Sequence, residues 1–179
     1  DVEPAELARV IDVNLRAPIM LSRMALPYLR ESGEGAIINV GSLAGRTPVP
    51  GAAVYSSTKA GLRAFTRALA EELRGSDIKV GLVSPGPIAT DFIMADMDKV
   101  SDITFSQPMS TVEDVAQTIL DLCGNNIGEK AMPALLGLLT TATYLVPWIG
   151  RQMRPMLERK GQQAKKKLKL EARAAADAD

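Results

Sequence analysis

Two short apolar runs, separated by a segment of helix length, constrain the fold of this chain most. The runs are AIINV (36–40) and DIKVGLVS (77–84), and both are rich in β-branched residues, as expected of strands that are buried on both faces. Residues 52–74 between them are expected to form a helix. A strand, a helix and a strand in this order predict a right-handed crossover and a parallel sheet.

Helical patterns flank the two runs. Apolar residues recur at helical spacing over residues 5–30, and the glycines of ESGEG (31–35) are expected to end that helix. Ser110 with Glu113 has the spacing of a capping box, which predicts a further helix that Gly124 closes. The order indicates an α/β fold with a doubly wound parallel sheet. In such sheets ligands bind at the carboxyl ends of the strands.

Composition excludes several kinds of chemistry. The chain has no histidine and one cysteine, Cys123, so we expect no disulfide, no zinc site and no Ser-His-Asp triad. The net charge is zero and aromatic residues make up 4% of the chain, which argues against a nucleic-acid partner. Chemistry must then depend on hydroxyl, amine, amide and carboxylate groups or on a cofactor.

Tyr55 and Lys59 are four residues apart, so on a helix they share one face. A free tyrosine has a pKa of about 10, and a nearby cation favours the phenolate form that a general base needs. Ser42 lies thirteen residues before Tyr55, just beyond the first strand. Its hydroxyl is placed to bind the oxygen to which Tyr55 gives a proton. VGSLAG lacks the G-x-S-x-G pattern of a hydrolase nucleophile.

Asn14 stands in the middle of a helical pattern, and Pro18 follows at i+4. Because proline has no N–H, the Asn14 carbonyl loses its helical partner and is free to hold a water molecule. The alternative is a bent surface helix with an exposed asparagine.

Asn14, GAIINVGSLAG, VYSSTKAGL and VSPGPIATD, in this order and spacing, resemble the short-chain dehydrogenase/reductase (SDR) family in its classical branch. The resemblance covers residues 1 to about 125. It implies that residues 1–130 are the C-terminal part of an incomplete Rossmann-like domain. It also implies an NAD(P)-dependent oxidoreductase that interconverts a carbonyl and an alcohol.

The resemblance also implies a role for each motif residue. Tyr55 would be the acid/base, Lys59 would favour its phenolate and bind the cofactor ribose, Ser42 would orient the carbonyl, and Asn14 would hold the water of a proton relay. The residues implied in cofactor binding are Tyr55 and Lys59 and, after the second strand, Pro85, Gly86, Ile88 and Thr90. Thr90 has an alternative role as the N-cap of a helix starting at Asp91.

The family's Gly-rich phosphate-binding turn is not among these residues. We therefore expect a truncated chain that binds NAD or NADP poorly and is inactive alone, and the choice between the two cofactors stays open. The resemblance implies a homo-oligomer. Two alternatives are a non-catalytic binding or scaffold protein with the SDR fold and an extended-type SDR that acts on nucleotide sugars.

The segment between the second strand and Ser110 corresponds to the variable substrate lid of the family. Its large apolar residues are Phe92, Ile93, Met94, Met97, Ile103, Phe105 and Met109. Flexible Met and Phe side chains suit an apolar carbonyl or alcohol substrate that is lipid-, steroid- or acyl-like. The alternative is that these side chains only close the core.

Residues 131–150 contain no charged residue, and nine Lys or Arg against two Glu follow in residues 151–173. We expect an added C-terminal tail, with residues 151–179 as a solvated, partly disordered basic helix. Three interpretations stay open for residues 131–173: a packed or subunit-covering helix, peripheral contact with a membrane, or a membrane span. No signal peptide opens the chain, and we expect a cytoplasmic location, at a membrane under the second interpretation.

Overall fold

A three-stranded parallel sheet forms the centre of the molecule. The computed structural model describes residues 2–90, 97 and 100–176, with side chains as far as residue 170. The strands β1 (Gly35–Val40), β2 (Ile78–Pro85) and β3 (Glu129–Met132) lie in the order β1-β2-β3. The doubly wound α/β fold and the first two strands are confirmed. The third strand, EKAM, was not predicted because its four residues carry two charges and no apolar run.

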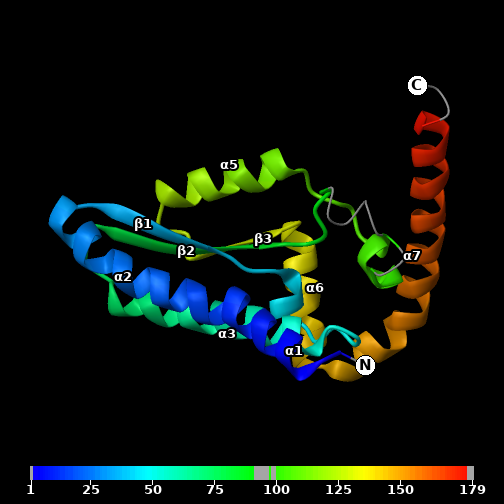
Figure 1. Ribbon diagram of the computed structural model, residues 1–179, viewed down its shortest axis with the longest axis horizontal. Coiled ribbons are helices and arrows are strands. Elements are labelled where there is room, and N and C mark those ends of the chain that lie inside the picture. Colours follow the sequence, from blue (N-terminus) through cyan, green and yellow to red (C-terminus); the bar gives the residue numbers. More distant parts are fainter. Residues whose placement is uncertain (1, 91–96, 98–99, 177–179) are drawn as a thin grey trace.

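Helices cover both faces of this sheet (Figure 1). On one face lie α2 (Ala17–Ser32) and α3 (Ala53–Glu72), and on the other lies α5 (Val112–Cys123). Each face has its own core cluster. Buried members of the first are Leu26, Leu69, Leu73 and Ile78, and those of the second are Val83, Val115 and Leu122. The sheet is therefore covered in the manner of a right-handed crossover fold.

The N-terminal helical segment contains a change of helix type at Asn14. Helix α1 (Pro4–Ile11) leads into a π-helical turn, η1 (Asp12–Arg16), and then into α2. The Ala17 N–H donates to the Asp12 carbonyl, five residues back. Because Pro18 offers no N–H to the Asn14 carbonyl, a wider turn at this point satisfies the neighbouring groups instead. The predicted disturbance thus takes the form of a π turn.

The start of α5 differs from the prediction by one residue. Thr111 is the N-cap, and its capping-box partner is Asp114, so the predicted pair of Ser110 and Glu113 is wrong. The Ser110 backbone is held in a parallel bridge with Ile88, and its N–H donates to the Pro87 carbonyl at 2.9 Å. Ser110 is therefore extended, and the helix begins after it. Gly124 closes the helix as predicted.

Two helices follow β3, α6 (Ala134–Leu145) and α7 (Pro147–Ala176). In Figure 1, α6 leads away from the end of β3, and α7 passes the short 3-10 helix η4 (Asp102–Ser106). Among the described residues, none of the helices has both the length and the apolar character needed to cross a membrane.

One face of α7 packs against η4. The sequence predicts a solvated basic helix here and does not predict this packed face. The Lys165 ammonium donates to the Val100 carbonyl and to the Asp102 carboxylate, each at 2.9 Å. A Cβ added to Gly161 would lie 1.8 Å from the Asp102 carbonyl oxygen, so the two backbones are in direct contact. The basic helix is thus tied to the segment that corresponds to the substrate lid.

A buried hydrogen bond between β1 and α3 gives a test of the fold. The Asn39 amide donates to the Thr66 hydroxyl at 2.9 Å, and both side chains are buried. We predict that Thr66→Val lowers the free energy of unfolding by about 1–3 kcal/mol, because the Asn39 amide then has no acceptor. Urea denaturation measures the change. Ser57→Ala, at an exposed position of the same helix, is the control, and equal losses in the two variants would contradict the prediction.

Candidate active site

The loop that follows β1 carries Ser42. Gly41 and Ser42 leave the strand, and Ser42 then caps the short 3-10 helix η2 (Leu43–Gly45). The Ser42 hydroxyl accepts a hydrogen bond from the Ala44 N–H at 3.1 Å. This bond uses a lone pair of the oxygen and leaves its proton available. The half-buried hydroxyl therefore lies at the carboxyl end of β1, with a donor still to offer.

Lys59 extends from α3 to the same end of β1. Its ammonium donates to the carbonyl of Val40, the last residue of the strand, at 2.9 Å. It also lies 5.8 Å from the centre of the Tyr55 ring. Burial lowers the pKa of Lys59 below its ordinary value. Tyr55 itself is 38% exposed, so its ring borders open space beside the lysine.

Gly45 is the reason that η2 and α3 lie so close together. A Cβ at Gly45 would lie 2.6 Å from the carbonyl carbon of Lys59 and 2.7 Å from its oxygen. Real Cβ atoms do not approach other atoms to this distance, so only glycine fits here. The contact places the loop that carries Ser42 directly on the helical turn that carries Lys59. The structure thus brings the loop and the Tyr55–Lys59 pair to one end of the sheet.

Asn14 reaches the neighbourhood of the same helix through its π turn. The next residue, Leu15, packs on α3 at Gly61, where an added Cβ would be 3.2 Å from the Leu15 methyl carbons. Gly61 lies two residues beyond Lys59. The half-buried Asn14 is therefore on the turn that contacts the lysine-bearing part of α3. Its role in a proton relay stays a prediction.

The turn after β2 lies close to the Ser42 loop. Pro85 ends the strand, and the Gly86 N–H donates to the Met132 carbonyl at 2.7 Å. A Cβ at Gly86 would meet the Leu43 side chain at 3.3 Å. The resemblance also implies Ile88 and Thr90 in cofactor binding. The Ile88 backbone forms a bridge with Ser110, and the Thr90 N–H donates to the Ile88 carbonyl. The helix expected at Asp91 lies outside the described residues, so the N-cap role of Thr90 stays a prediction.

Part of the predicted substrate lid is described. Phe92, Ile93 and Met94 lie outside the described residues. Met97 and Phe105 are buried, and Ile103 and Met109 are half-buried. The ring of Phe105 lies 5.5 Å from the Lys165 ammonium, at the contact between η4 and α7. Phe105 thus helps to hold the lid segment against the C-terminal helix.

A charged cluster that sequence reasoning missed connects the elements of the site. The carboxylate of Glu129, at the start of β3, accepts hydrogen bonds from Arg46 after η2, from Arg63 on α3 and from Ser84 near the end of β2. These residues are 45 to 83 positions from Glu129, and no local pattern links them. The cluster fixes the relative positions of the three elements that carry the candidate site residues.

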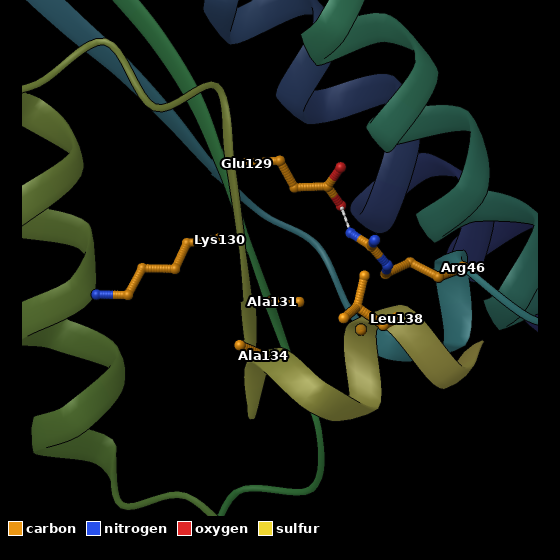
Figure 2. A pocket seen from close by; sticks show the side chains of 7 residues that line it. Arg46, Glu129, Lys130, Ala131, Ala134 and Leu138 are labelled. Atoms are coloured by element: carbon orange, nitrogen blue, oxygen red, sulfur yellow. Dashed lines mark hydrogen bonds and ion pairs between the residues drawn. The ribbon is translucent and has the colours of Figure 1, made fainter. Parts of the chain in front are cut away.

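Arginine neighbours set the charge state of this cluster. Burial alone would raise the pKa of Glu129, but the Arg63 hydrogen bond and charge, the Arg46 charge and the Ser84 hydroxyl together hold it below its ordinary value. Figure 2 shows the Glu129 carboxylate directed at Arg46, while Lys130 points to the other side of β3. A cavity of about 320 Å³ opens here between β3 and α6. The ion pair lines one wall, and the other lining residues are Lys130, Ala131, Ala134, Gly137 and Leu138.

The family model for short chain dehydrogenase matches residues 1–101 of the chain. This match covers more than half of the 179 residues. The chain belongs to the short-chain dehydrogenase/reductase family. The resemblance found in the Asn14, Ser42, Tyr55–Lys59 and PGPIAT motifs is therefore confirmed at the level of the family.

Individual SDR proteins are similar over the same region. Ketoacyl reductase HetN from Nostoc sp. is 34% identical over 125 residues, which are 70% of this chain and 43% of that protein. A mutant 4-hydroxyisoleucine dehydrogenase complexed with NADH and succinate has a TM-score of 0.60 at 29% identity, over 71% of this chain and 57% of that chain. Serine dehydrogenase complexed with NADP+ has a TM-score of 0.62 at 27% identity, over 73% of this chain and 56% of that chain. The matched part of this chain thus spans less than half the length of ketoacyl reductase HetN.

The Gly45 contact leads to a prediction about the site. We expect Gly45→Ala to lower the free energy of unfolding by about 1–3 kcal/mol, because the new methyl group pushes the Ser42 loop away from α3. The matched control is Gly128→Ala, since an added Cβ at Gly128 meets nothing within 4 Å. Thermal denaturation of both variants measures the difference. Equal melting temperatures would show that the close approach at Gly45 is not required.

Proposed function

We propose that the protein to which this chain belongs is an NAD(P)-dependent oxidoreductase that interconverts a carbonyl and an alcohol on an apolar substrate. One observation carries the proposal. The Lys59 ammonium is fixed on the Val40 carbonyl at the carboxyl end of β1, beside the Tyr55 ring and the loop of Ser42. Membership of the SDR family supports the same activity.

In the proposed reaction each residue has a separate task. The Tyr55 hydroxyl gives a proton to the carbonyl oxygen during reduction and takes it back during oxidation. The Ser42 hydroxyl donates to the same oxygen and orients it. The Lys59 ammonium lies 5.8 Å from the centre of the Tyr55 ring, where its charge stabilises the negative charge that develops on the oxygen as the proton leaves. Asn14 holds the water that returns the proton to solvent.

The residues present fit the nicotinamide end of a dinucleotide. The bound cofactor supplies the hydride acceptor or donor. Lys59 has two further ammonium protons for ribose hydroxyls besides the one on Val40. Gly86 packs against the Leu43 side chain in the turn after β2, and its backbone would border the nicotinamide ring. Pro85, Ile88 and Thr90 would border the ring and its carboxamide. The choice between NAD and NADP stays open, since the similar solved structures include complexes with NADH and with NADP+.

An apolar substrate is the finer part of the proposal. Met97, Ile103, Phe105 and Met109 give the predicted lid segment an apolar character. One relative is named as a ketoacyl reductase, which is consistent with a substrate that carries an acyl chain. A cytoplasmic location belongs to the same proposal.

We also propose that the protein is a homo-oligomer paired through the face of α2 that points away from the sheet. This face exposes a row of large apolar residues, with Met20, Leu21 and Met24 more than half exposed. Residues at positions i, i+1 and i+4 form a stripe on one side of a helix. A second copy of the chain would cover this stripe.

The acid/base assignment is tested in the full-length protein. We predict that Tyr55→Phe lowers kcat at least about a hundredfold, as expected for the loss of a general acid, and leaves cofactor binding in place. The matched control is Tyr28→Phe, which removes the same atom from a ring on α2 that is 73% exposed. Steady-state reduction of an apolar ketone with NADH or NADPH measures both variants. Unchanged turnover in Tyr55→Phe would refute the catalytic role of Tyr55, whereas no turnover in the unmodified protein would favour a scaffold function.

A second prediction concerns the 179 residues alone. Within the described residues β1 pairs only with β2, and the Gly-rich turn that receives the cofactor phosphates in this family is not in the sequence. We therefore predict that calorimetric titration of this chain with NADH or NADPH gives no micromolar affinity, whereas the full-length protein binds one of them. Micromolar binding by the chain would contradict this prediction without affecting the assignment of Tyr55.

A further inference from the structure

One side of α6 exposes a continuous apolar stripe. Leu135, Leu138 and Leu145 are 67%, 70% and 73% exposed, and Leu139 and Val146 extend the same stripe. Within α6, positions 135, 138, 139, 142 and 145 follow the i, i+3, i+4 and i+7 pattern of one helix face, and Val146 comes directly after the helix. Single exposed leucines are common on protein surfaces, but a stripe of this kind marks an interaction site. We call Leu135, Leu138, Leu139, Leu145 and Val146 the α6 apolar face.

The opposite side of α6 is fixed to the rest of the fold. Gly137 is buried, and an added Cβ there would lie 2.4 Å from the Ala131 side chain on β3. The Thr141 hydroxyl accepts a hydrogen bond from Arg46 at 3.0 Å, and the Thr143 and Thr47 hydroxyls are 3.2 Å apart. The small and polar side of the helix thus faces inward. The leucines on the other side of α6 are therefore exposed, and Leu138 also borders the open cavity beside Glu129.

Aromatic and basic residues follow the α6 apolar face along the chain. Tyr144 and Trp148 are 61% and 59% exposed at the junction of α6 and α7. The basic segment 151–173 begins three residues after Trp148, with Arg151 and Arg159 exposed on α7. Exposed leucines, then aromatic rings, then cations are the arrangement of helices that lie at a lipid–water interface.

We propose that the α6 apolar face and the start of α7 dock the protein onto the surface of an anionic lipid bilayer. The leucines enter the boundary between headgroups and acyl chains, Trp148 and Tyr144 lie at the headgroup level, and the arginines approach anionic headgroups. The contact is peripheral, because no described helix meets the length and hydropathy of a span. The docking is independent of the proposed catalytic activity.

Charge favours a lipid surface over a second copy of the chain as the occupant. A symmetric contact between two α6 apolar faces would bring two copies of the start of α7, with the exposed Arg151, to the same interface. Arg154 adds less charge there, since it is paired with Glu158 at 2.7 Å. Like charges placed together oppose association, whereas an anionic surface attracts both. The basic segment therefore favours docking on an anionic lipid surface and opposes the pairing of two α6 apolar faces.

Flotation with lipid vesicles tests the proposal on the intact chain. One set of vesicles is pure phosphatidylcholine, and the other contains about 30% phosphatidylglycerol. We expect flotation with the anionic vesicles, weaker flotation with the neutral ones, and weakening by salt. Leu138→Glu combined with Leu145→Glu should lower binding at least about tenfold, because two leucines no longer enter the lipid and two negative charges are added.

A charge-matched control separates the α6 apolar face from charge alone. Val112→Glu combined with Leu120→Glu adds the same two charges at exposed apolar positions of α5, and this variant should keep its binding. Failure of the unmodified chain to float, equal flotation with both vesicle types, or equal losses in the two variants would overturn the proposal. So would a dimer in sedimentation equilibrium that only the α6 variant abolishes, since the occupant would then be a second copy.

Discussion

The contact between Gly45 and the backbone of Lys59 is the constraint on which the candidate site depends. It removes the space of one side chain between the loop after β1 and helix α3. With that space removed, the Lys59 ammonium reaches the Val40 carbonyl and the Ser42 loop lies on the same helical turn. A side chain at position 45 would push the loop away from α3 and so increase the distance between the Ser42 hydroxyl and the Lys59 ammonium.

Glu129 fixes the same arrangement from the third strand. Its carboxylate accepts hydrogen bonds from Arg46, Arg63 and Ser84, so one half-buried anion joins the loop, the helix and the second strand. Buried ion pairs contribute little net stability, since desolvation offsets much of their attraction. Their directional hydrogen bonds still select one arrangement among several that are similarly packed. In this molecule Glu129 acts on the orientation of the site more than on the total stability of the fold.

Local patterns were sufficient for much of this structure. The strands β1 and β2, the helix that carries Tyr55 and Lys59, and the position of Ser42 follow from apolar runs, helical spacing and order along the chain. Features that depend on distant partners could not be predicted. The strand β3 forms because it pairs with β2, and its composition does not indicate a strand. The N-cap of α5 is Thr111 and not Ser110, because the Ser110 backbone forms a bridge with Ile88. The Glu129 cluster has the same long-range origin.

The ties between Lys165 and the lid segment have a consequence for the synthesis of the protein. Residues 100–106 leave the ribosome well before α7, and synthesis proceeds at about 5–20 residues per second. For several seconds the lid segment therefore exists without the ammonium that binds the Val100 carbonyl and the Asp102 carboxylate. The sheet and its two core clusters can form in that interval up to β3. Helix α7 thus completes the packing of a segment that was synthesised some sixty positions earlier.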